Sequence, residues 1–103
     1  MEYNNLVCNA IDDYNIFTKS QKKILKSLVE LSVDNKVVAT IPELMKINGT
    51  TRATVATALD FFKQNSFIDV PDMTGIRFSY CTLNAAKLEE IIKHHQNKIK
   101  LLK

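Results

Sequence analysis

The sequence predicts an α+β fold that is mostly α-helical, in a single domain spanning residues 1–103. Three observations lead to this prediction. A chain of 103 residues can bury one hydrophobic core but not two. Apolar residues recur at helical spacing through most of the chain, while strand-like runs are short and few. Only two Gly and two Pro interrupt the pattern, which is typical of a helix-rich globular protein.

Residues 1–17 predict a first amphipathic helix, because apolar residues recur at helical spacing from Leu6 to Phe17. The run "TKSQ" at 18–21 fits a capping box, in which Thr18 and Gln21 each bond the other's backbone N–H. A second helix therefore starts there. After it, the β-branched run "KVVAT" predicts one brief strand.

Residues 40–66 predict two helices joined by a tight turn. "TIPE" at 40–43 is a second capping box, formed by Thr40 and Glu43. Asn48 and Gly49 both accept the left-handed conformation that ends a helix. Thr50 or Thr51 can then cap the next helix at once. Two helices that meet across a three- or four-residue turn containing Gly are typical of a helix-turn-helix.

Residues 67–83 predict a hairpin, since the runs "FIDV" and "IRFSYCTL" are strand-like and "PDMTG" joins them. Residues 84–103 predict a last helix capped by Asn84. Acidic residues lie near its start and lysines near its end, which complements the helix dipole. No repeat, linker or low-complexity segment divides the chain.

Composition and motifs exclude several classes of function. Cys8 and Cys81 form no CxxC motif or Cys/His cluster, so we expect reduced thiols in a cytoplasmic protein. No apolar run approaches a membrane span, and the N-terminus lacks the basic region of a signal peptide. His94 and His95 are adjacent and lack the four-residue spacing of helical metal ligands. No phosphate loop or GxSxG motif is present. We therefore expect no catalytic residue, metal, cofactor, membrane contact or small-molecule substrate.

The segment "IPELMKINGTTRATVATALDFFKQNSFIDVPDMTGIRFSYCTL" resembles a winged helix-turn-helix domain of the broad class that holds the ArsR-like and MarR-like repressors. Thr50 departs from the pattern, because an apolar residue is usual there. The residues that carry the resemblance are Glu43-Leu44, Gly49, Thr51-Arg52-Ala53-Thr54-Val55, Leu59 and Phe67-Ile68.

In length and layout the chain is similar to the TubR-type proteins of plasmids and phages. The shared features are an extra N-terminal helix, Thr-Val-Ala-Thr in the recognition helix, a short wing and a lone C-terminal helix. Those proteins are winged-helix dimers that bind centromere-like DNA and connect it to a tubulin-like GTPase filament. The resemblance implies the same two partners here, together with a C-terminal helix that serves dimerisation.

In such a fold, the second helix of the pair inserts into the major groove, with Val55, Leu59 and Phe62 turned inward. Its outward side is small and smooth, which suits close approach to thymine methyl groups in AT-rich DNA. The alternative is that these are ordinary surface residues that touch nothing. The predicted base-contacting residues are Thr51, Arg52, Ala53, Ala56 and Thr57, and the predicted phosphate contacts are Lys36, Thr40, Lys46, Thr54 and Lys63.

A mildly basic net charge of +3 allows nucleic-acid binding without establishing it. In the wing, Arg77 is the available base, and we expect it to contact the minor groove or a phosphate; the alternative is a solvated strand residue. With so few bases, one monomer would bind weakly, so a dimer is expected.

The last helix carries a heptad-like stripe, spaced four, three, four and three residues apart. We interpret it as a dimer seam, with the first helix as a companion surface and a histidine that could make dimerisation sensitive to acid. The alternative is that the stripe covers its own monomer. The predicted interface residues are Leu6, Ile11, Leu88, Ile92, His95, Ile99 and Leu102.

These observations lead to one main hypothesis and two alternatives. The main hypothesis is a cytoplasmic, DNA-associated homodimer that binds specific DNA as the centromere-binding adaptor of a plasmid or phage partition system, and that can also repress its own operon. The first alternative is a small transcriptional repressor. The second is a winged-helix protein-interaction module that does not bind DNA.

Overall fold

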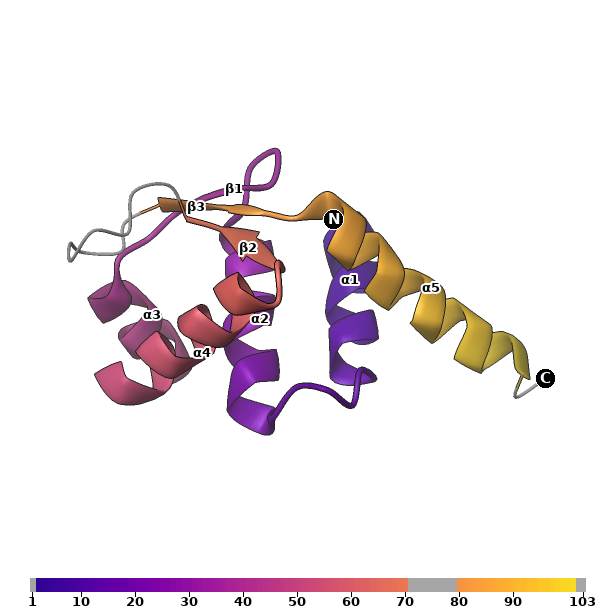
Figure 1. Cartoon of the computed structure of the whole chain (residues 1–103), viewed down its shortest axis with the longest axis horizontal. Coiled ribbons are helices and arrows are strands. Elements are labelled where there is room, and N and C mark those ends of the chain that lie inside the picture. The colour runs from indigo at the N-terminus through magenta and orange to yellow at the C-terminus, as the bar shows by residue number, and fades with distance from the viewer. Residues whose placement is uncertain (1, 71–79, 102–103) are drawn as a thin grey trace.

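The computed structural model describes residues 2–70 and 80–101, and side chains over 5–70 and 80–98. It confirms a mostly helical α+β fold with a small antiparallel sheet (Figure 1). The described elements follow in order as α1 (Glu2–Asp12), α2 (Lys19–Leu31), β1 (Lys36–Val38), α3 (Ile41–Asn48), α4 (Arg52–Gln64), β2 (Ile68–Asp69), β3 (Tyr80–Leu83) and α5 (Ala85–Leu101).

The sheet places β3 between β1 and β2, and both neighbours run antiparallel to it. Val37 pairs with Cys81, and Ile68 pairs with Leu83. These four side chains are buried because they form the inner face of the sheet, which packs on the helices. The expected pairing of the two late strands is therefore present. The residues predicted to link them, including Arg77 and the run "PDMTG", lie outside the described residues.

The predicted capping residues occupy their expected positions. Thr18 Oγ1 accepts a hydrogen bond from the Gln21 N–H at 3.2 Å, and Gln21 Oε1 accepts one from the Thr18 N–H at 3.0 Å. A second capping box, formed by Thr40 and Glu43, begins α3 in the same way. Gly49 ends α3 in the left-handed region, at φ 58°. Local chemistry thus determines where α2 and α3 begin and where α3 ends.

The prediction that the first helix continues to residue 17 is wrong, because α1 ends at Asp12. Tyr14 and Phe17 leave the helix, and both rings join aromatic contacts. The centroid of the Phe17 ring lies 5.1 Å from that of Phe67 and 5.8 Å from that of Phe62, and the rings meet edge to face. Burial of Phe17 between distant segments stabilises this loop.

A buried polar pair fixes α3 against α2. Ser27 Oγ lies 2.9 Å from Asn48 Oδ1, and Asn48 Nδ2 donates to the Leu44 carbonyl at 2.9 Å. Both side chains are buried, so these bonds replace those that water would have made. Asn48 therefore ends α3 while also binding its last turn to α2.

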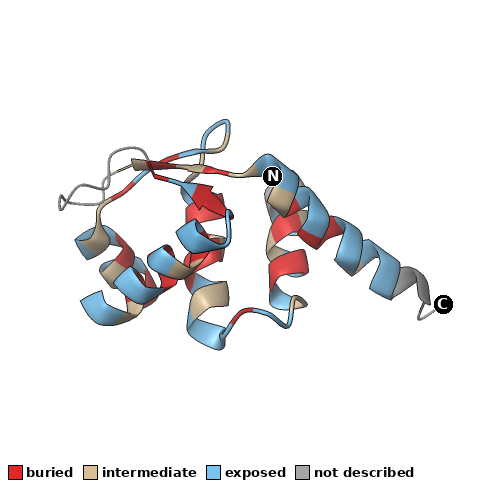
Figure 2. Cartoon of the chain, viewed as in Figure 1, coloured by how far each residue is buried: buried red, intermediate tan, exposed pale blue. Residues whose placement is uncertain are grey.

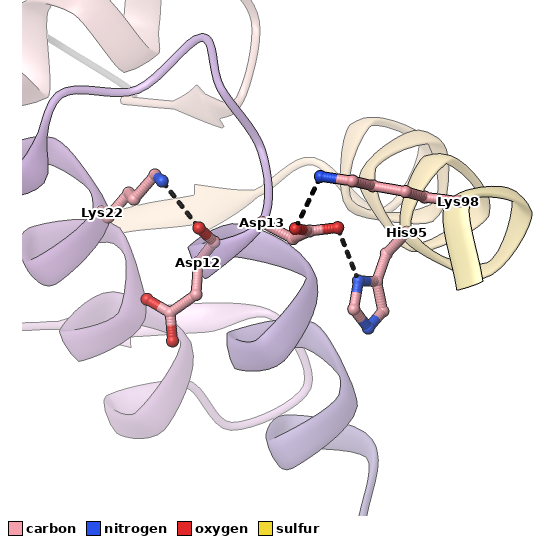
Figure 3. Close-up of polar contacts among 5 residues, drawn as sticks. All are labelled: Asp12, Asp13, Lys22, His95 and Lys98. Carbon is pink, nitrogen blue, oxygen red and sulfur yellow. Dashed lines mark hydrogen bonds and ion pairs between the residues drawn. The ribbon is translucent and has the colours of Figure 1, made fainter. Parts of the chain in front are cut away.

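Two adjacent residues at the end of α1, Asp12 and Asp13, contact different helices (Figure 3). Asp12 contacts α2, since Lys26 Nζ lies 2.7 Å from its carboxylate and Lys22 Nζ donates to its carbonyl at 2.6 Å. Asp13 contacts α5, with Lys98 Nζ at 3.0 Å and His95 Nδ1 at 3.1 Å. The hydrogen bond from Lys98, followed by that from His95, lowers the pKa of the Asp13 carboxyl. This turn therefore orients α5, whose far half extends beyond α1 (Figure 1).

The first half of the stripe on α5 that was predicted as a dimer seam packs within its own chain. Ile11, Leu88 and Ile92 are 0%, 1% and 4% exposed, because α5 packs its apolar face on α1 of the same chain. Leu6 is half-buried against this core, and His95 is held by Asp13 within the chain. These five residues therefore cover their own monomer. The side chain of Ile99, and the whole of Leu102, lie outside the described part.

Replacement of Gly49 tests the turn between α3 and α4. A Cβ at this position would meet no atom within 4 Å, so the cost of Gly49→Ala comes from its positive φ alone. We expect Gly49→Ala to lower the free energy of unfolding by about 1 kcal/mol, and Gly49→Asn by less. Urea denaturation measures both. Equal stability of the wild type and the alanine variant would contradict the left-handed turn.

Asp13→Asn tests the anchor of α5 through its pH dependence. Because the folded-state pKa of Asp13 is lowered from 3.8, its ion pairs stabilise the fold above that pH. The stabilisation is lost as the pH falls through the lowered folded-state pKa. We therefore expect the variant to be less stable at neutral pH and equal to wild type in strong acid. Thermal melts across this pH range measure the difference, with the exposed Glu89→Gln as a control that stays constant.

Candidate nucleic-acid interface

One face of α4 is exposed and begins with small side chains, while the other face is part of the core. Val55, Ala58, Leu59 and Phe62 are buried, as the helical spacing predicts. Over the first two turns, the opposite face carries one long cationic side chain, that of Arg52. The five predicted base-contacting residues are all exposed, and they lie together over the first two turns at Thr51, Arg52, Ala53, Ala56 and Thr57.

The start of α4 is held firmly by local bonds. Thr51 Oγ1 accepts a hydrogen bond from the Thr54 N–H at 3.2 Å, so Thr51 is the N-cap. The Thr51 and Thr54 hydroxyls also lie 3.0 Å apart. Thr54 is half-buried beside the cap, where its backbone N–H donates to Thr51. The exposed face is therefore presented on a rigid helix and not on a loop.

An open hollow of about 360 Å³ lies beside this face, between α4 and the start of α2. Its α2 side was not predicted from the sequence, because the run at 18–21 indicated only a helix cap. The start of a helix carries partial positive charge, which favours an anion there. The lining residues are the N-cap Thr18 with Ser20 and Gln21 of α2, and Ala53, Thr54, Thr57 and Ala58 of α4.

The bases around the start of α4 come from three helices. Arg52 is exposed at its first position, and Lys46 is exposed in the last turn of α3. Lys19 and Lys23 are exposed in the first turns of α2, and Lys23 Nζ donates to the Asn48 carbonyl at 3.4 Å, beside the turn before α4. Neither of these two lysines was predicted as a contact. Their position follows from the packing of α2 against α3.

The far end of α4 has a mixed charge. Asp60 is exposed, and Gln64 Nε2 donates to its carboxylate at 3.0 Å. Lys63 is exposed in the last turn. At a rise of roughly 1.5 Å per residue, Lys63 lies about 16 Å along the axis from Arg52. The first two turns of α4 are therefore the end that best accepts a polyanion.

Two of the predicted phosphate contacts, Lys36 and Thr40, lie outside α4 and stay predictions. Lys36 lies on β1 and alternates with buried Val37, so its side chain is on the outer face of the sheet and away from α4. The Thr40 hydroxyl is engaged in its capping box, 3.1 Å from the Glu43 carboxylate, which would repel a phosphate. Arg77 is not among the residues that the structure describes.

Neither thiol of the chain is activated by its surroundings. Burial raises the pKa of Cys81 to about 12. Burial, followed by the charge of Glu30, raises the pKa of Cys8. Both thiols are thus held in the unreactive protonated form. Within residues 2–70 and 80–101 no cluster of three potential metal ligands occurs, and no helix has the length and apolarity to cross a bilayer.

No protein-family model, curated protein or solved structure matches the chain. The proposed function therefore rests on the geometry and charge of the candidate interface.

Variants of Thr51 and Arg52 distinguish a residue that stabilises α4 from one that only presents an exposed side chain. Thr51→Ala removes the cap, and we expect it to lower the free energy of unfolding by about 1 kcal/mol. Thr51→Ser keeps the hydroxyl and should retain most of that stability. Arg52→Ala removes an exposed side chain and should change stability by less than about 0.5 kcal/mol. Urea denaturation measures all three, and a large loss with Arg52→Ala would mean that its guanidinium supports the fold.

Proposed function

We propose that this protein binds double-stranded DNA, with α4 as the recognition helix of a winged helix-turn-helix. The observation that carries the proposal is the exposed face over the first two turns of α4, where every side chain except that of Arg52 is small and Thr51 caps the helix. In this assignment α3 and α4 are the paired helices, and residues 67–83 are the wing. The extra helices α1 and α5 pack on each other beside this unit.

The face suits insertion into a major groove, which is roughly 12 Å wide. Ala53 and Ala56 have no side chain beyond Cβ, so the helix backbone can approach the base edges closely. The methyl groups of these residues and of Thr57 can pack against thymine methyls. Arg52 can donate two hydrogen bonds to a guanine. We therefore propose an AT-rich site that contains at least one G·C pair per half-site.

The hollow beside α4 supports a contact with a phosphate of the bound DNA. Hydroxyl groups line it, and the first turn of α2 opens onto it. Lys19, Lys23 and Lys46 are exposed around α4 and add positive charge without reading bases. Backbone contacts of this kind supply much of the affinity of a DNA-binding domain. So few bases in one chain favour a homodimer over a monomer.

The narrower role rests on the resemblance to TubR-type proteins. In that role, dimers bind repeated, centromere-like sites and connect the DNA to a tubulin-like GTPase filament. A small transcriptional repressor would use the same face of α4 on a single operator. A protein-interaction module is favoured by a different observation, the exposed carboxylate of Asp60 on the proposed DNA face.

A titration of the protein onto duplexes tests the proposal. The probes are DNA flanking its gene and a scrambled duplex of equal length, each at two salt concentrations. We expect Arg52→Ala to weaken binding to the specific duplex about ten- to hundredfold, because a bidentate contact to guanine is lost. Lys93→Ala removes one exposed positive charge from α5, away from α4, and serves as the matched control with little effect.

Each outcome of this titration points to one function. Cooperative binding to several repeats supports the partition adaptor, and saturation at one palindrome supports the repressor. Equal, feeble and salt-sensitive binding to both duplexes by wild type and variants would contradict specific recognition. That last result would favour the protein-interaction module.

A further inference from the structure

The outer face of the sheet carries exposed apolar side chains on rigid strands. Residues paired directly across an antiparallel sheet share a face, so the outer face follows from the register. Val38 is 77% exposed and Val33 is 72% exposed, more than any other large apolar side chain over the described ranges. The outer face consists of Val33, Lys36, Val38, Tyr80, Thr82 and Asp69.

The same register aligns two opposite charges across this face. Lys36 pairs with Thr82, and Thr82 pairs with Asp69, so the three residues form one row. The positive charge is on β1, the negative charge is on β2, and they are about 10 Å apart, two strand spacings. Neither makes an ion pair with another described residue. The face is therefore positive along one edge and negative along the other.

The β1 edge of the sheet offers little for strand addition. Lys36 already uses its backbone N–H and C=O on Val33, at 3.0 and 2.9 Å, in a tight turn through Asp34 and Asn35. Only the backbone groups of Val38 then point outward from β1. A partner that pairs with the edge would gain few hydrogen bonds, so the accessible feature is the side-chain face.

We propose that this face packs against the same face of a second copy of the chain, about a two-fold axis parallel to β3. Rotation about that axis places β1 of one copy over β2 of the other. Lys36 then faces the partner's Asp69 at both ends of the row, so the charges are complementary twice. Thr82 lies at the centre of the row, with Val38 and Tyr80 supplying apolar contact in the next row.

This interface is compatible with DNA on α4. Figure 1 shows the sheet along the upper side of the molecule and the first turn of α4 along the lower side, so the two surfaces can be occupied together. A three-stranded face is small, and interfaces of small area belong to the weak class. The two-fold axis lies beyond the outer face of the sheet, so the pair carries the first turns of its two α4 helices on opposite sides. The interface itself does not depend on DNA binding.

Charge reversal tests this interface on the full chain. Sedimentation velocity over a range of concentrations compares wild type with Lys36→Glu, with Asp69→Lys and with an equal mixture of the two variants. Each variant alone faces like charges in its own dimer, and we expect its association to weaken at least about tenfold. In the mixture, Glu at 36 faces Lys at 69 and Asp at 69 faces Lys at 36, so association should return.

Ile16→Ser is the matched control, since Ile16 is also exposed, at 60%, but lies in the loop between α1 and α2. It should associate like wild type, whereas Val38→Ser should weaken association. Circular dichroism verifies that each variant is folded. A wild type that stays monomeric at every concentration would overturn the proposal. Dimers whose association is the same in the wild type and the charge-reversal variants would overturn it too. DNA binding is measured separately through Arg52, so a failure of one proposal leaves the other distinguishable.

Discussion

The contact of Phe17 with the end of α4 and the start of β2 is the interaction on which the rest of the structure depends. Its ring meets those of Phe61, Phe62 and Phe67 with centroids 5.1 to 6.1 Å apart. The backbone supports the same junction, because the Phe67 N–H donates to the Phe62 carbonyl at 2.8 Å and the Asn84 N–H donates to the Phe67 carbonyl at 2.9 Å. This junction holds the C-terminal end of α4, which is the end opposite the candidate interface.

The distribution of burial gives the molecule two surfaces with different chemistry. Figure 2 shows buried residues where the helices and the inner side of the sheet face one another. The exposed start of α4 is small, hydroxyl-rich and bordered by bases, which suits a polyanion that must approach closely. The outer face of the sheet is apolar and carries one charge of each sign. That pattern suits a copy of itself better than DNA, because a polyanion would be repelled by Asp69.

The polar contacts mainly set the relative orientation of elements and contribute little to the total stability. Exposed ion pairs such as Lys98–Asp13 stabilise weakly. They nevertheless connect the turn after α1 to α5, as the buried Ser27–Asn48 pair connects α2 to α3. The consequence for function is indirect. The α3–α4 pair and the α1–α5 pair each keep a defined geometry on the shared core, so a DNA contact on α4 would be presented at a fixed angle to the sheet.

The sequence by itself determined the helix boundaries set by local chemistry and the buried stripe of α4. Capping boxes, the Gly49 turn and Asn84 depend on neighbours within a few residues, so they can be found without a fold. It also grouped the exposed residues of α4 correctly on one side. The tertiary structure decided the rest. Phe17 packs on distant rings outside the helix, the first half of the stripe on α5 packs on α1, and Lys36 lies on the outer face of the sheet. The hollow at Thr18 and the Lys36–Asp69 row join segments about thirty residues apart in the chain, and only the packing of the helices and strands brings such segments together.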